Sequence, residues 1–320
     1  MPEREVFTRS ESMALSMIRV FAMTLIVSCH IAQCFDLQIA YLLNIGVQIF
    51  FFMSGFLYGR LDIPKSPFDF YKKRFVKVLL PYYIFLVVII AIYLVFQLYQ
   101  FNAKQILFYL LNLQWFSTPI EGLNHLWFLT VLMVGYLLTP WVIKFHKKYP
   151  LFFIAAFLVC CVIEFMLVRK FYSFCAWVVL YFSGMLFGLY YSKRISNLVL
   201  LMSAIVLAVL LVLFKPDWLT QFEFRYHTIW LHWVLGLFLF VFFFRVLPLV
   251  INPNKKHPFI KHLDSISYEV YLIHHPLILG PLSMMFLTPY VWLNILLLLF
   301  AVYILSRLLH YIGSFSKSLL

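Results

Sequence analysis

Charged residues are scarce in this sequence of 320 residues. Asp, Glu, Lys and Arg together account for 12% of the chain, whereas about a quarter is usual for a soluble domain. Hydrophobic residues account for 64%, and the mean hydropathy is strongly positive at +0.95. This composition excludes an ordinary soluble domain and indicates an integral membrane protein that crosses the bilayer several times.

Cysteine is also rare, and the spacing of the five residues does not match paired metal ligands. Their odd number argues against a complete disulfide framework. We expect most of them to be small apolar residues in helices and expect no metal site. They are Cys29, Cys34, Cys160, Cys161 and Cys175.

Internal repeats, low-complexity linkers and a cleavable signal peptide are not evident, and the chain ends soon after its last apolar segment. We therefore expect a single membrane domain over residues 1–320 with no appended soluble domain. The net charge of +13 does not indicate nucleic-acid binding, because the basic residues lie in short loops between apolar segments.

Apolar segments of about twenty residues predict ten membrane-spanning helices in an all-α bundle. The stretch 104–116 is too short to cross the bilayer and is interpreted as an interfacial or re-entrant helix. The predicted spans lie near residues 14–33, 41–59, 78–99, 124–145, 151–168, 172–191, 197–214, 227–249, 265–286 and 290–312.

Basic residues accumulate in every second loop of this arrangement. Since positively charged loops remain in the cytoplasm, the bias predicts that both termini are cytoplasmic and that the number of spans is even. The 37 phenylalanines and the cysteine pattern favour a bacterial plasma membrane. The basic residues of the alternate loops are only Lys104, Arg169, Lys170, Lys215 and Arg225.

The first predicted span contains two ionisable residues, Arg19 and His30. On a helix they lie only about 20° apart around the axis and about 16 Å apart along it, with Arg19 toward the cytoplasm. Ionisable groups within a membrane are costly, so they usually face the protein interior and serve a function. In the alternative interpretation, Arg19 extends to the interface as a topology signal and His30 makes a local polar contact.

Other predicted spans also carry polar residues that contact with lipid would penalise. The second span contains Asn44, Gln48 and Ser54, although helix packing alone could account for the adjoining Ser54-Gly55 step. Before the fourth span, Trp127 fits an interfacial aromatic belt, and His125 lies near the depth expected for His30. In the ninth span, the residues that fall close to one helix face are Ser267, Tyr271, His274 and His275.

The most basic loop precedes the third span and contains Lys73, Arg74 and Lys77, followed by Pro81. Attraction to anionic lipid headgroups is one interpretation of this cluster. The functional interpretation is a clamp for a phosphorylated cytosolic ligand, because Lys and Arg match the geometry of phosphate.

Taken in order, these segments resemble the acyltransferase 3 family of membrane O-acyltransferases, and the resemblance extends over nearly the whole chain. This sequence has Leu-Ser-Met-Ile before Arg19, where many relatives have an Asp-Gly-Leu lead, and it lacks the extracytoplasmic esterase-like domain of some relatives. Because of these two departures, the resemblance does not identify the acceptor of the acyl group. The matching segments are Arg19–x10–His30, Gly46 to Gly55, Lys73-Arg74 before Pro81, His125-Leu-Trp127-Phe-Leu and Ser267 to His274.

The resemblance implies a ten-span bundle that transfers an acyl group, usually acetyl, from cytosolic acyl-CoA to a hydroxyl of a sugar or cell-envelope polymer. It also implies that Arg19, His30 and the cluster of Lys73, Arg74 and Lys77 are essential. Acyl-CoA would be a co-substrate, with no tightly bound cofactor. The expected partners are a glycan or lipid-linked sugar acceptor and the membrane lipids.

Physical chemistry suggests a role for each end of the first span. The phosphates of acyl-CoA would meet the basic cytoplasmic residues, and the pantetheine arm would enter past Arg19. His30 would act as general base toward a hydroxyl that arrives from outside, while Arg19 belongs to the acyl-CoA side or to a charge network. We favour direct transfer, although a covalent acyl-enzyme intermediate is the alternative. The alternative function is a polysaccharide transporter or flippase, which should show repeat symmetry or broken spans.

Overall fold

The computed structural model describes residues 7–60, 66–167, 174–214, 226–252, 255 and 257–318. Helices dominate this part of the chain, and it contains no β-strand, so the predicted all-α class is confirmed. The basic residues of the alternate loops that lie outside the described residues are Arg169, Lys170, Lys215 and Arg225.

Every predicted span contains at least part of a helix in the structure. The predicted spans correspond to α1 (Arg9–Cys34), α2 (Ile39–Leu43) with α3 (Ile45–Arg60), α4 (Pro67–Val95), α6 (Trp127–Lys148), α7 (Pro150–Leu167), α8 (Phe174–Leu189), α9 (Lys193–Phe214), α10 (Tyr226–Val250), α12 (Ser267–Leu279) and α13 (Val291–Ser318). By length and composition, seven helical segments of the described chain can cross a membrane, and α7 and α8 are shorter apolar helices. The protein is therefore a membrane protein, and ten crossings remain a prediction.

The predicted ninth span differs most from the structure. A separate amphipathic helix, α11 (Pro258–Ser265), ends where the span was expected to begin, and α12 ends at Leu279 instead of near residue 286. Gly280 and Pro281 stop the helix there. With 13 residues, α12 is about 20 Å long, shorter than a hydrocarbon core of about 30 Å, and it is largely buried inside the bundle.

Local sequence signals explain where other helices begin and end. At the start of α1, Thr8 Oγ1 accepts a hydrogen bond from the Glu11 amide, and the Glu11 carboxylate accepts one from the Thr8 amide. The apolar stretch expected at 104–116 forms α5 (Ala103–Leu110) and a 3₁₀ turn at Gln114–Phe116, both too short to cross the bilayer.

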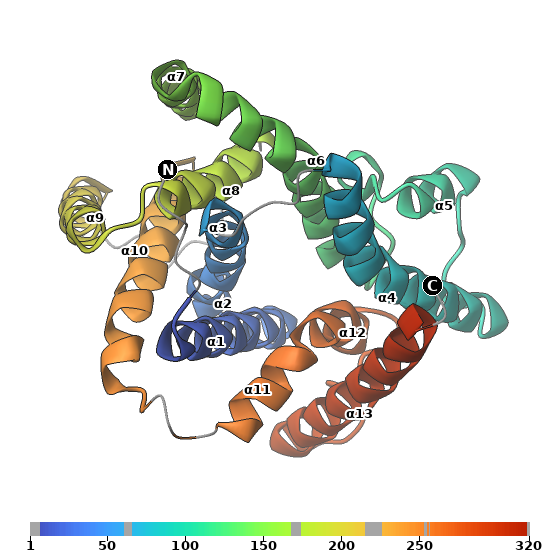
Figure 1. The fold of residues 1–320 in the computed structure, drawn as a ribbon. Coiled ribbons are helices and arrows are strands. Elements are labelled where there is room, and N and C mark those ends of the chain that lie inside the picture. Colours follow the sequence, from blue (N-terminus) through green and yellow to red (C-terminus); the bar gives the residue numbers. More distant parts are fainter. Residues whose placement is uncertain are drawn as a thin grey trace.

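The interior of the molecule is built around α1, α3 and α12, whereas α5, α7 and α9 lie at the periphery (Figure 1). The closest helix pair is α3 with α8, because glycines let the two backbones approach. A Cβ added at Gly55 would lie 1.8 Å from the carbonyl oxygen of Tyr181, and one at Gly184 would lie 2.0 Å from that of Phe52. The Ser54-Gly55 step therefore has a packing role.

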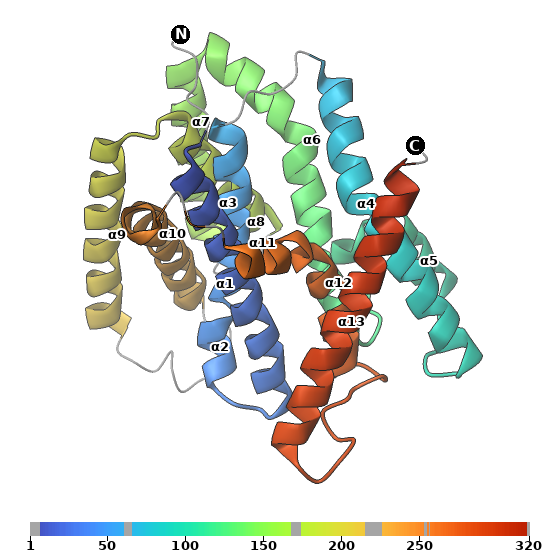
Figure 2. The ribbon, with the colours of Figure 1, turned by 60° about the horizontal axis from the view of Figure 1, so that its bottom comes forward.

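Helix α11 lies across the direction of α1 and α13, and it contacts α1 near the middle of the molecule (Figure 2). The first turn of α1 and the last turn of α13 lie toward the same side (Figure 2). An even number of crossings predicts this arrangement. That this side faces the cytoplasm remains a prediction from the distribution of basic residues.

Candidate active site

A cavity of about 400 Å³ lies between α1, α3, α4, α6 and α12, and both Arg19 and His30 line it. Helical periodicity predicts that these two side chains share a face, and the structure places both on the same cavity. The other predicted site residues that line the cavity are Ser54, Arg74, Lys77, His125, Trp127 and Tyr271.

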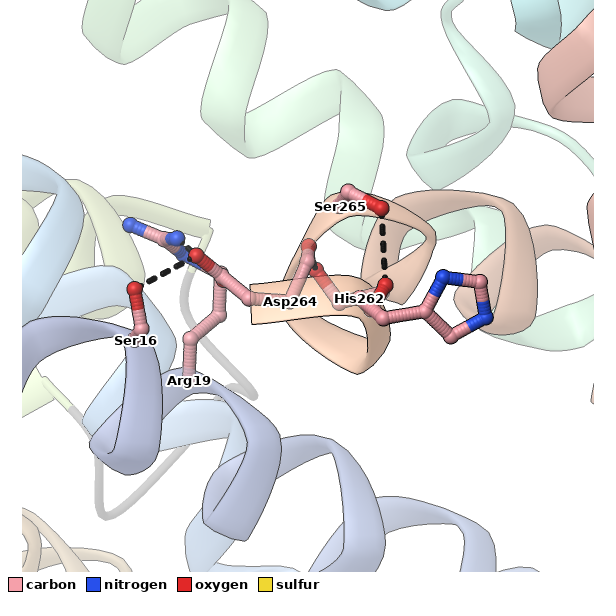
Figure 3. Close-up of polar contacts among 6 residues, drawn as sticks. Ser16, Arg19, His262, Asp264 and Ser265 are labelled. Atoms are coloured by element: carbon pink, nitrogen blue, oxygen red, sulfur yellow. Dashed lines mark hydrogen bonds and ion pairs between the residues drawn. The ribbon is translucent and has the colours of Figure 1, made fainter. Parts of the chain in front are cut away.

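One end of the cavity holds an ion pair between Arg19 and Asp264 of α11. Ser16 Oγ also donates a hydrogen bond to Asp264 Oδ2 at 2.7 Å (Figure 3). The side chains of Arg19 and Asp264 are 28% and 17% exposed, so the pair is partly buried. Of the two roles expected for Arg19, the structure supports the charge network, and this network ties α11 to α1.

The other end of the cavity holds His30, whose Nδ1 lies 2.7 Å from Oε1 of Gln33 on the next turn of α1. The amide oxygen can only accept a hydrogen bond, so Nδ1 carries the proton that is donated to it. Nε2 of the neutral ring therefore keeps a free lone pair, which is the state required of a general base. Gln33 was not selected from the sequence, although the spacing of three residues on a helix is a usable signal.

Three further histidines form a cluster with His30, and two of them contact its ring directly. The ring centroids of His275 and His274 lie 4.6 and 5.2 Å from that of His30, and the ring of His125 stacks on His275 at 4.6 Å. His125, which the sequence places near the depth of His30, thus belongs to the same group of histidines as His30. His274 is fully buried behind the cavity, while His125 lines it.

Backbone carbonyls orient these three rings. His125 donates from Nε2, and His274 and His275 donate from Nδ1, at 3.2, 3.0 and 2.9 Å. Tyr271 donates its hydroxyl hydrogen to the carbonyl oxygen of His125 at 2.6 Å, which joins α12 to the start of α6. Each ring thus has a defined tautomer with a single N–H that is already used. The accepting carbonyls belong to Leu272, Val270 and Gly122.

A second pair of ionisable residues, Glu269 and His310, lines the cavity and was not selected from the sequence. The Oε1 atom of Glu269 lies 2.9 Å from Nδ1 of His310 on α13, and the Glu269 side chain is 6% exposed. The buried Oε2 atom of Glu269 has no hydrogen-bond partner in the described protein. Sequence reasoning could have flagged Glu269, which lies five residues before His274, but no local signal connects it to His310.

The basic cluster divides between the cavity and the surface. Arg74 and Lys77 line the cavity, whereas Lys73 is exposed and does not line it. The Arg74 guanidinium lies 5.0 Å from the ring centroid of Tyr58 and 6.0 Å from that of Phe70. The prediction treated a contiguous run as one cluster, but successive residues of α4 point about 100° apart.

Two neutral hydrogen-bond donors also line the cavity, Trp127 at the start of α6 and Asn44 between α2 and α3. The indole of Trp127 packs against Trp177 and Trp115, with ring centroids 5.0 and 5.2 Å away. Asn44 was noted in the sequence as a polar residue of the second span but was not selected as a site residue.

In the described chain, no group of three or more His, Cys, Asp or Glu side chains could hold a metal ion.

This arrangement joins an end that carries Arg19, Arg74 and Lys77 to a histidine end within one cavity. Arg19 and His30 lie about 16 Å apart along α1, so an extended ligand with anionic groups at the charged end could reach His30. The lone pair of His30 suits proton removal from a hydroxyl at the other end.

Comparison with known protein families agrees with this chemistry. The family model Acyl_transf_3, described as an acyltransferase domain, matches residues 14–311. Neither the curated proteins nor the solved structures give a match to this chain. Because the family match extends over more than half of the sequence, the chain belongs to the acyltransferase 3 family and is a membrane acyltransferase.

Proposed function

We propose that this membrane acyltransferase moves an acyl group, in the first instance acetyl, from cytosolic acyl-CoA to a hydroxyl of a cell-surface or secreted glycan. The observation that carries the proposal is the single cavity that connects His30 to Arg74 and Lys77. A transferase of this kind must bring a polyanionic donor and a neutral hydroxyl acceptor together across the thickness of a membrane.

Acyl-CoA enters at the basic end of the cavity in this proposal. Arg74 and Lys77 contact its phosphates, because a guanidinium and an ammonium group both form charge-assisted hydrogen bonds with phosphate. No carboxylate of the described residues forms an ion pair with Arg74, which leaves its charge available to a ligand. Arg19 is neutralised by Asp264 and lines the path of the pantetheine arm.

His30 acts as the general base in the transfer step. Its Nε2 takes the proton of the acceptor hydroxyl while that oxygen attacks the thioester carbonyl carbon. Gln33 holds the ring in the tautomer that leaves Nε2 unprotonated. The orientation predicted from the basic loops places this end of the cavity toward the outside, where glycan acceptors would be found.

The first test is binding of acetyl-CoA to the purified full-length protein in nanodiscs. The Arg74→Gln/Lys77→Gln variant is compared with Lys72→Gln/Lys73→Gln, which removes the same charge from exposed positions of the same helix. We expect the first variant to lose at least about tenfold in affinity, a cost of about 1.4 kcal/mol, and the second to lose less than about twofold.

Equal weakening by both pairs would contradict a specific phosphate site at the cavity and would support general attraction of anions to the basic loop. Saturable binding that neither pair affects would contradict the proposed donor site. Absence of acetyl-CoA binding to folded wild-type protein would overturn the donor assignment as a whole.

A further inference from the structure

Acyl transfer from a thioester creates negative charge on the carbonyl oxygen, and a buried site must stabilise that charge with hydrogen-bond donors. This requirement is the same for direct transfer and for a covalent intermediate, because each forms a tetrahedral adduct. The donors at the His30 end of the cavity can be identified by elimination. This inference rests on the proposed function.

The four histidines cannot supply the donors. Each neutral imidazole has one N–H, and in each of the four rings that N–H already donates to an oxygen atom of the protein. His30 donates to the Gln33 side chain, and His125, His274 and His275 donate to backbone carbonyls. His30 and His125, the two rings of the cluster that line the cavity, therefore offer a ligand lone pairs and not hydrogen atoms.

The nearby hydroxyl groups and cations cannot supply the donors either, because they already bind other groups of the protein or lie far from His30. Tyr271 donates to the carbonyl of His125, and Tyr268 donates to the carbonyl of Val78. Arg19 is paired with Asp264 about three turns of α1 away from His30. Ser54 lies ten residues beyond Asn44, about 15 Å along α3.

Asn44 is held at the level of His30 by contacts on both sides of it. Before Asn44, the Ala40 carbonyl accepts a hydrogen bond from the Cys29 thiol at 3.1 Å. After it, Gly46 packs so closely on α1 that an added Cβ would lie 2.4 Å from the Ala22 carbonyl oxygen. The backbone at Asn44 is therefore held beside the turns of α1 that precede His30, and its side chain lines the cavity there.

Trp127 provides a second donor from α6. Its indole N–H can only donate, and the ring is fixed between Trp115 and Trp177. Both Asn44 and Trp127 line the cavity, and neither side-chain polar group has a hydrogen-bond partner in the described part of the protein. Both groups can therefore donate a hydrogen bond to a ligand, and packing holds the Trp127 ring in place.

We propose that the side-chain amide of Asn44 and the indole N–H of Trp127 form the oxyanion hole of this acyltransferase. The hydroxyl oxygen of the acceptor bonds to the thioester carbon as its proton passes to His30 Nε2, and the carbonyl oxygen becomes an oxyanion that accepts hydrogen bonds from Asn44 and Trp127. When the C–S bond breaks, the oxyanion becomes the ester carbonyl, and the CoA thiolate takes the proton from His30. The products are an O-acyl ester and the free thiol of CoA.

The test measures turnover of acetyl-CoA, as release of CoA thiol, by the full-length protein in nanodiscs. The acceptor is the envelope fraction of the cells in which the protein is native. Asn44→Ala removes the donor, and Asn44→Asp replaces it with an acceptor of nearly the same shape. Both should lower kcat about 10²- to 10³-fold while the Kd for acetyl-CoA and the unfolding temperature stay close to wild type. Trp127→Phe deletes the N–H but keeps an aromatic ring, and it should also lower kcat at least about tenfold.

The matched control is Gln48→Met, which removes another side-chain amide four residues further along the chain, on α3. Gln48 is buried but does not line the cavity, so kcat should stay within about threefold of wild type. A kcat for folded Asn44→Ala within threefold of wild type would overturn the inference. If that variant fails to fold, unchanged kcat in Trp127→Phe would overturn it instead. Failure of the wild type to cleave acetyl-CoA would overturn the proposed function, which is a distinguishable result.

Discussion

Arg19 of the first helix forms an ion pair with Asp264 of α11, although 245 positions separate them in the sequence. A cation within a membrane helix is costly unless it is paired, and Asp264 supplies the partner. The pair also holds α11 across α1, at the end of the cavity where acyl-CoA is proposed to enter.

Removal of one partner of the ion pair should therefore destabilise the protein more than removal of both partners. We expect Arg19→Gln and Asp264→Asn each to destabilise the protein by about 1–3 kcal/mol, because each leaves a partly buried charge unpaired. The double variant should recover part of this loss, with a coupling energy of at least about 0.5 kcal/mol. Thermal unfolding of the detergent-solubilised protein measures the cycle, and strictly additive losses would show that the pair does not couple.

The hydrogen bond between His30 and Gln33 predicts that substitutions of Gln33 alter kcat. Gln33→Leu removes the acceptor for the Nδ1 proton, so the ring loses its fixed tautomer. We expect kcat to fall by about one order of magnitude while acetyl-CoA affinity is unchanged, because the ring remains but is no longer oriented for general-base catalysis. Gln33→Glu should retain most activity, since a carboxylate accepts the same hydrogen bond. Equal loss of activity in the Leu and Glu variants would argue against a role in orientation.

The contact between α3 and α8 makes a prediction about stability. Gly55→Ala would place a methyl group 1.8 Å from the Tyr181 carbonyl oxygen, so the two helices would have to separate. We expect a loss of at least about 2 kcal/mol or failure to accumulate in the membrane. Gly313→Ala is the control, because its nearest neighbour would be a side-chain atom of Pro81 at an ordinary 3.6 Å. Similar unfolding temperatures for the two variants would contradict the close packing.

Features with a short range along the chain were predictable from the sequence. The apolar segments predicted the helices because a bilayer demands runs of that length, and helical periodicity predicted that Arg19 and His30 share a face. Blocks that are local in sequence, such as His125-Leu-Trp127, also led to residues that line the cavity.

Features that depend on tertiary contacts were not predictable in the same way. Asp264 and His310 lie far along the chain from Arg19 and Glu269, and nothing local indicates either pairing. Lys73 is adjacent to Arg74 in sequence, yet the turn of the helix directs only Arg74 toward the cavity. Gly280 and Pro281 end α12 locally, but only the burial of this helix inside the bundle shows that it need not match the thickness of the bilayer.

General-base catalysis by His30 is tested by measuring the transfer of labelled acetyl groups from acetyl-CoA to the native envelope fraction. We expect His30→Ala to lower kcat by about 10²- to 10⁴-fold, since it removes the general base, while membrane insertion and acetyl-CoA binding are retained. His262→Ala is the matched control, because His262 is on α11 and does not line the cavity. If folded His30→Ala transfers acetyl groups as fast as the wild type and the His262→Ala control, His30 is not the general base.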